Sequence, residues 1–260
     1  MIFMASQGLY LRWANIAAFI ITLVVNGLSN TTLIGGRTTA EVSNTYSTLI
    51  TPAGYVFAIW GIIYVLLGFF LVYQALPSQK GNPFQKQISG LFILTCVFNV
   101  VWLFFWQNEL LPISVVIIFA FLASLIAIYL RLNIGRSNVN LKEKLFVHVP
   151  FSVYLGWVSI ATIANIAATL VSVGWDGFGL NLETWAILVL ALALILDLAV
   201  IATRRDIAYS LVFIWALAGI SVNQTANPSI VLTAEIAIAI IAVALVIANV
   251  FSWLRRKSYF

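Results

Sequence analysis

Apolar residues gather into eight long runs separated by short polar segments. The runs cover roughly residues 13–30, 53–76, 88–107, 110–131, 146–172, 184–203, 207–222 and 228–254. A helix rises 1.5 Å per residue, so a run of about 20 residues crosses a hydrocarbon core of about 30 Å. The pattern therefore predicts an all-α, polytopic transmembrane helical bundle with about eight spans.

Basic residues stand at the ends of these runs, and nearly all fall on one side when the chain is threaded from a cytoplasmic N-terminus. The cytoplasmic side then holds Arg12, Lys80, Lys86, Arg131, Arg136, Lys142, Lys144, Arg204, Arg205, Arg255, Arg256 and Lys257, and the outer side holds Arg37. Short loops with this bias obey the positive-inside rule. We therefore expect both termini in the cytoplasm, in a bacterial inner membrane or another energy-transducing membrane.

The composition agrees with a membrane location. Hydrophobic residues make up 63% of the chain, charged residues 8%, and the mean hydropathy is +1.07. The net charge of +5 does not indicate a nucleic-acid partner, because the basic residues mark the membrane edge, where anionic headgroups attract them. The lipid bilayer is the expected partner, and the single Cys96 excludes an intramolecular disulfide.

The longest outer segment, residues 31–52, is polar and contains Gly35-Gly36 and Pro52. We expect it to form a structured cap or lid, and a flexible connector is the alternative that its composition leaves open.

Tryptophans fall into two groups. Five lie at the ends of spans, where aromatic belts explain them: Trp13, Trp106, Trp175, Trp185 and Trp253. Four lie inside spans: Trp60, Trp102, Trp157 and Trp215. An indole N–H in hydrocarbon needs a hydrogen-bond partner, so this second group requires either helix packing or a ligand.

Three spans carry an aromatic and amide stripe at helical spacing. The stripes are Phe57, Trp60 and Tyr64; Asn99, Trp102 and Trp106; and Pro150, Tyr154, Trp157, Ala161 and Asn165. At 1.5 Å per residue, Trp60, Asn165 and Trp102 lie about 12, 10 and 8 Å below the outer ends of their spans. They should converge in the outer half of the bundle, and Asn26 could join them. Interhelical packing and ligand contact both remain open for each residue.

The opposite stripe of the second span holds Gly54, Gly61 and Gly68 at heptad spacing. Small residues at this spacing are typical of close helix packing, either within the bundle or between subunits of a homodimer.

These residues also carry a family resemblance. Three segments resemble, in order, the second-, third- and fifth-helix motifs of the TspO/MBR family, the tryptophan-rich sensory proteins and the mitochondrial translocator (peripheral benzodiazepine receptor). The segments are Thr51-Pro-Ala-Gly-Tyr-Val-Phe57-Ala-Ile-Trp60-Gly-Ile-Ile-Tyr64, Asn99-Val-Val-Trp102 and Tyr154-Leu-Gly-Trp157-Val-Ser-Ile-Ala161-Thr-Ile-Ala-Asn165.

The resemblance covers roughly residues 10–173 and implies a five-helix bundle that binds porphyrins, haem-pathway intermediates or sterols beneath its first loop. It implies no cofactor other than a tetrapyrrole bound as ligand. The ligand-binding residues it implies are Tyr55, Phe57, Trp60, Tyr64, Asn99, Trp102, Tyr154, Trp157, Ala161 and Asn165.

The chain departs from the family pattern in several places. Tyr55 stands where the family usually has Trp, and Val153 stands where it usually has Pro. The last three spans have no counterpart in the five-helix members. We therefore divide one membrane domain into a TspO-like bundle, residues 1–173, and three additional helices, residues 174–260.

The leading functional hypothesis is a membrane protein that binds a hydrophobic or planar ligand, tetrapyrrole-like or sterol-like, in the outer half of the bundle, as a sensory or regulatory receptor or as a carrier. A secondary transporter using the intramembrane Asp197 and Glu235 as proton or substrate sites is one alternative. A membrane scaffold or assembly subunit is another. The sequence has no hydrolase triad near the pocket, no metal-ligand cluster and no phosphate-binding loop, so we expect no enzymatic activity.

Overall fold

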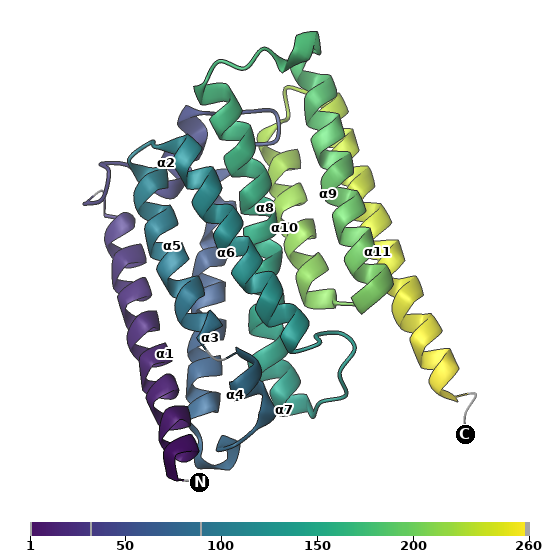
Figure 1. Cartoon of the computed structure of the whole chain (residues 1–260). Coiled ribbons are helices and arrows are strands. Elements are labelled where there is room, and N and C mark those ends of the chain that lie inside the picture. The colour runs from purple at the N-terminus through teal and green to yellow at the C-terminus, as the bar shows by residue number, and fades with distance from the viewer. Residues whose placement is uncertain (1, 32, 89, 258–260) are drawn as a thin grey trace.

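Eight long helices follow the eight apolar runs in the computed structural model of the chain (Figure 1). The structure describes the backbone of residues 2–31, 33–88 and 90–257, and the side chains of 10–31, 33–88 and 90–250. The side chains of Trp253, Arg255, Arg256 and Lys257 lie outside the described residues. The long helices are α1 (Ile2–Ser29), α3 (Ile59–Ala75), α5 (Leu91–Gln107), α6 (Leu111–Arg131), α8 (Val149–Ser172), α9 (Leu182–Arg204), α10 (Ile207–Asn223) and α11 (Pro228–Lys257).

Short helical segments connect the long ones. They are α2 (Thr39–Thr45), η1 (Gly54–Ala58), η2 (Pro77–Gln79), α4 (Pro83–Ile88), α7 (Leu141–Glu143), the π-helical turn η3 (Lys144–His148) and η4 (Gly177–Gly179). The expected cap is present, because segment 31–52 contains α2. A capping box begins α2: the Thr38 hydroxyl accepts from Glu41 N, and the Glu41 carboxylate accepts from Thr38 N.

The chain is an integral membrane protein. Within the described residues, six helical segments are long and apolar enough to cross a bilayer: Tyr10–Ser29, Gly54–Ala75, Leu111–Arg131, Leu141–Ser172, Leu182–Arg204 and Pro228–Val250. The shorter apolar helices α5 and α10 lie among them, with 17 residues each. All described elements are helical, which satisfies the requirement that backbone groups in lipid find partners within their own segment.

The helices stand side by side between two ends of the bundle (Figure 1). Helix α1 begins and α11 ends at one end, here called the terminal end, and α2 lies at the opposite end, the lid end. Helix α1 packs on α5 and α3, α5 on α6, α6 on α8, and α3 on α8. Helix α10 packs on α8 and on both α9 and α11, so it joins the C-terminal helices to the first five.

Two glycines let α10 approach its neighbours closely. A Cβ at Gly156 would lie 3.0 Å from the backbone oxygen of Tyr209, and a Cβ at Gly219 would meet the side chain of Val56. At that contact, Ala53 N donates to Gly219 O at 3.0 Å. Small residues allow such approaches between helices in membranes. The second half of the chain is therefore packed directly against the first.

The glycine stripe on the second span makes no such contact. No heavy atom comes within 4 Å of a Cβ built at Gly54, Gly61 or Gly68. Of the two alternatives, close packing inside the bundle is therefore excluded for this stripe, since η1 and α3 turn it away from their neighbours. The homodimer remains a prediction.

Candidate functional site

A cavity of about 60 Å³ lies at the lid end, enclosed by η1, α3, α5, α8, α9 and α10 and covered by α2. Its lining is almost wholly aromatic and aliphatic. The lining residues are Thr39, Ser43, Ile50, Pro52, Phe57, Trp60, Trp102, Trp106, Trp157, Ile160, Ala161, Ile163, Ala164, Asn165, Val189, Leu190, Ala193, Phe213, Ala216, Leu217 and Ile220.

Trp60 is at the centre of the aromatic wall. Its ring lies edge-to-face with Trp157, with centroids 6.1 Å apart and planes at 88°, and tilted against Trp102 at 6.0 Å and 32°. Phe57 meets Trp157 edge-to-face at 5.9 Å. Edge-to-face pairs suit the ring quadrupoles and hold these rings in defined orientations. The wall therefore presents fixed aromatic surfaces to the cavity.

The indole N–H groups of the interior tryptophans differ in their partners. Trp102 Nε1 donates to Asn165 Oδ1 at 2.8 Å, and Trp215 Nε1 donates to Val56 O at 3.0 Å. Trp157 Nε1 is buried and has no partner among the described residues. A buried donor left unpaired costs about 1–3 kcal/mol, so native structures seldom retain one without a reason.

Asn165 lines the cavity, but the protein already uses its amide. Oδ1 accepts from Trp102, and Nδ2 donates to Ser114 Oγ at 2.8 Å. These bonds tie α8 to α5 and α6. They fix the ring of Trp102 rather than presenting a free amide to the cavity.

Three of the implied residues do not line the cavity: Tyr64, Asn99 and Tyr154. They form a polar cluster on the side of the cavity that faces the terminal end. Asn26 Nδ2 donates to Asn99 Oδ1 at 2.8 Å, and Asn99 Nδ2 donates to the Tyr154 hydroxyl at 3.3 Å. Asn99 is fully buried, which such pairing allows. This group joins α1, α5 and α8 beneath the aromatic wall.

Six of the ten residues implied by the resemblance thus meet at the cavity: Phe57, Trp60, Trp102, Trp157, Ala161 and Asn165. Tyr55 lies apart from them. It is 48% exposed and packs edge-to-face on Trp215 at 5.4 Å, on the outer side of η1.

Sequence reasoning missed one wall of the cavity. Helix α9 contributes Val189, Leu190 and Ala193, and α10 contributes Phe213, Ala216, Leu217 and Ile220. Both sets repeat every three or four residues. This spacing predicts a buried helix face but does not identify the residues or the cavity that the face contacts. The assignment of Trp106 to an aromatic belt was also wrong. This residue is 3% exposed, lines the cavity and stacks on Trp102 at 5.9 Å.

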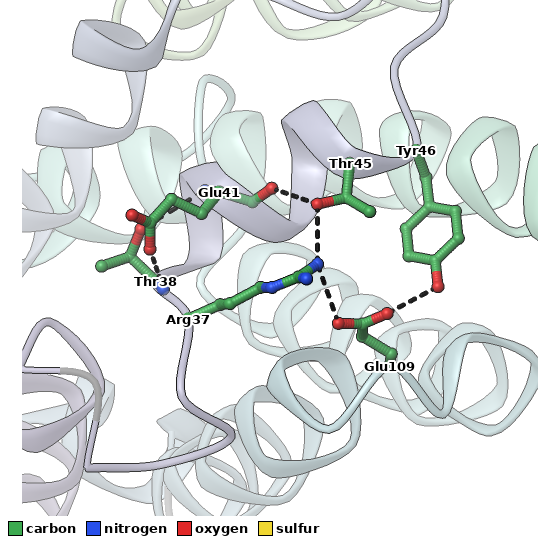
Figure 2. A network of polar contacts seen from close by, with 6 residues as sticks. All are labelled: Arg37, Thr38, Glu41, Thr45, Tyr46 and Glu109. Atoms are coloured by element: carbon green, nitrogen blue, oxygen red, sulfur yellow. Dashed lines mark hydrogen bonds and ion pairs between the residues drawn. The ribbon is translucent and has the colours of Figure 1, made fainter.

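Polar contacts hold α2 over the cavity. Figure 2 shows Arg37 forming an ion pair with Glu109 at 3.1 Å and donating to Thr45 Oγ1 at 3.0 Å. The Tyr46 hydroxyl donates to the other Glu109 oxygen at 2.6 Å, and this hydrogen bond raises the pKa of Tyr46. The lid is thereby fastened to the residues that follow α5.

The apolar side of the lid has its own anchor. Trp106 Nε1 donates to Thr39 O at 3.2 Å, which places the start of α2 on the cavity wall. Backbone and side-chain hydrogen bonds from Thr38 lower the pKa of Glu41, so its capping carboxylate is charged at neutral pH.

The ionisable residues inside spans occupy different environments. Asp197 on α9 is fully buried, and neither carboxyl oxygen has a hydrogen-bond partner among the described residues. Glu235 on α11 is exposed and accepts from Ser221 Oγ at 3.1 Å. His148 is buried near the terminal end, and its Nε2 has no partner in the described part of the chain.

Comparison with known proteins places this arrangement in a family. No curated protein and no solved structure matches the chain. The model of the family described as TSPO-like protein matches residues 12–247. The match includes the helices of the aromatic wall and also α9, α10 and most of α11. A match over nine-tenths of the sequence, around a cavity built from the predicted motif residues, shows that the chain belongs to the family of TSPO-like proteins.

Proposed function

We propose that this protein binds a hydrophobic small molecule in the cavity beneath α2 and acts as a sensory or regulatory receptor or a carrier. The observation that carries the proposal is an aromatic cavity with a buried, unpaired donor, Trp157 Nε1, in its wall. Ligand sites typically combine an apolar lining with a few placed polar groups. A ligand with a carbonyl or carboxylate edge would satisfy the free indole N–H while its rings pack against Trp60 and Phe57.

The size of the cavity limits how a ligand enters. A buried water needs about 10–15 Å³ of such volume, so 60 Å³ corresponds to about four to six water-sized positions. A tetrapyrrole or sterol is larger than this. We therefore propose that binding of such a ligand widens the cavity by displacing α2 or by separating α9 from α8.

The weak contacts that hold α2 favour the first of these routes, the displacement of α2. The Arg37–Glu109 ion pair is partly exposed, with side chains 47% and 33% accessible, and such pairs contribute about 0–1 kcal/mol. Lifting α2 would break this pair and a few hydrogen bonds, whereas separating two long helices would lose the van der Waals packing along their whole contact. A ligand can then enter from the lid end without unfolding the bundle.

The test is a tryptophan-fluorescence titration with protoporphyrin IX in nanodiscs. The variants are Trp60→Phe and Trp157→Phe, with Trp13→Phe as the matched control because Trp13 is 64% exposed and far from the cavity. We expect saturable quenching that both cavity variants weaken and the control leaves unchanged. Quenching that never saturates, or that is equal in all four proteins, would mean partitioning into lipid and would refute the proposal.

A further inference from the structure

Asp197 lies beneath the floor of the cavity, between α9 and α10. It is four residues, or one helical turn, from Ala193, which lines the cavity. Its side chain is fully buried, and both oxygens lack partners among the described residues. Across the interface, Ser210 lies near this carboxyl and is itself fully buried, and its Oγ has no hydrogen-bond partner within the described part of the chain. Ser210 lies three residues from Phe213, another lining residue.

No cation faces Asp197 from any packed helix in the described part of the chain. Helix α10 presents Tyr209, whose hydroxyl donates to Ser159 Oγ at 3.2 Å, and Asp206 at its N-terminus. Helix α11 has Glu235, about 12 Å nearer the lid end at 1.5 Å per residue, bonded to Ser221. Arg204 ends α9 at the terminal end, and Arg205 follows it there. Among the described residues, the carboxyl therefore has hydroxyl and acidic neighbours but no basic one.

An ionised carboxylate in this position would be costly. The effective penalty for burying an unpaired ion is several kcal/mol, and an added negative Asp206 increases it. A neutral carboxylic acid avoids this penalty, and after a small side-chain movement its O–H can donate to Ser210 Oγ, which would give both groups a partner. A metal cation would need several more ligands, and the described residues contain no group of three His, Cys, Asp or Glu that could hold one.

We propose that Asp197 is a proton-binding site whose proton is linked to occupancy of the cavity. The linkage follows from the shared interface: Ala193 and Phe213 line the cavity one turn above Asp197 and Ser210. Once α2 is displaced, a ligand larger than the closed cavity presses between Ala193 and Phe213, which loosens the α9–α10 contact below and admits water. Asp197 then ionises, so binding releases a proton. By reciprocity, loss of the proton strengthens ligand binding. This linkage rests on the proposed ligand-binding function, whereas protonation of Asp197 in the closed state does not.

Polar side chains lie along the α8–α10 interface between Asp197 and the terminal end. Asp206 Oδ2 accepts from the Tyr129 hydroxyl at 2.9 Å and from Ser152 Oγ at 2.6 Å, close to that end. The Tyr209–Ser159 hydrogen bond continues along the α8–α10 interface toward Ser210. Toward the lid end, the cavity offers an almost wholly apolar wall. The proton therefore exchanges with the terminal side, which the basic residues mark as cytoplasmic.

The first arm of the test examines protonation without a ligand. Infrared spectra at neutral pH would compare the wild type with Asp197→Asn, and with Asp176→Asn as the control on an exposed loop. Asparagine imitates the neutral acid in shape, so the variant should fold. We expect a carbonyl band of a neutral carboxylic acid that Asp197→Asn removes and Asp176→Asn retains. A spectrum without this band, or one that Asp197→Asn leaves unchanged, would overturn the proton site.

The second arm examines linkage with protoporphyrin IX dimethyl ester, a probe without carboxylates, from pH 6 to pH 8. We expect wild-type affinity to rise with pH, by up to about tenfold per unit for one released proton. Asp197→Asn should bind with an affinity that does not change with pH. Saturable binding with the same pH dependence in both proteins would refute the linkage but leave the proposed function intact. Absence of saturable binding at every pH would refute the proposed function and the linkage together, while the infrared arm would still decide the protonation state.

Discussion

Replacement of Gly219 by alanine tests whether α10 is built into the ligand-binding bundle. A Cβ at this position would fall within 3.0 Å of Val56 Cγ2 and 3.4 Å from Pro52 Cβ. Carbon atoms in contact are normally about 3.5–4.0 Å apart, so α10 and η1 must separate by at least about 0.5 Å. Val56 cannot easily move aside, because it is fully buried and β-branched.

The cost follows from the contacts at this point. Overpacking typically destabilises by about 1–3 kcal/mol. Separation also stretches the Ala53 N to Gly219 O and Trp215 Nε1 to Val56 O hydrogen bonds, each worth about 0.5–1.5 kcal/mol. These terms overlap, since relief of the clash is what breaks the bonds, so we expect a loss of about 2–3 kcal/mol in the free energy of unfolding.

Gly61→Ala is the matched control. Both glycines are helical, so both variants gain the same helix propensity of about 1 kcal/mol, but a Cβ at Gly61 meets no heavy atom within 4 Å. Unfolding can be followed on heating by reaction of a thiol-specific fluorophore with Cys96, the single and buried cysteine. We expect Gly219→Ala to unfold several degrees below Gly61→Ala. Equal midpoints, or a higher one for Gly219→Ala, would refute the close contact between α10 and η1.

Three further predictions concern the wall and the lid. Asn165→Leu removes the acceptor of the Trp102 indole and should lower stability by about 1–3 kcal/mol; an unchanged midpoint in the same thermal assay would contradict this. Arg37→Ala breaks the partly exposed ion pair with Glu109 and should speed dissociation of bound porphyrin by up to about fivefold. Stopped-flow fluorescence measures this rate, and an unchanged rate would show that the ion pair does not hold the lid closed. The capping hydrogen bonds lower the pKa of Glu41 below its ordinary value of 4.5. The carboxylate therefore stabilises α2 fully above pH 4.5, and this stabilisation is lost as the pH falls through the folded-state pKa. Hydrogen exchange of α2 should show this acid sensitivity in the wild type and not in Glu41→Gln.

Several features of the site could be predicted from the sequence because they depend on local spacing. Residues three, four and seven positions apart share a helix face, so the meeting of Trp60, Trp102 and Trp157 followed from their stripes and depths. Other features could not be predicted. Asn99 was expected to contact a ligand as Asn165 was, yet it pairs with Asn26 below the cavity. The two amides have the same local pattern and differ only in what the facing helices present.

The sequence by itself determined the number and extent of the spans, because these follow from apolar run length along one stretch of chain. It left the segment 31–52 open between a cap and a flexible connector, and the cytoplasmic placement of the basic residues stays a prediction. Only the tertiary structure decided that α9 and α10 complete the cavity, that Trp106 belongs to its wall and that Asp197 lies beneath its floor. In lipid, helix pairing has no hydrophobic driving force and depends on the fit of small residues such as Gly156 and Gly219 against distant side chains. This fit depends on the shapes of two helix surfaces that are distant in the sequence, so it cannot be predicted from either segment alone.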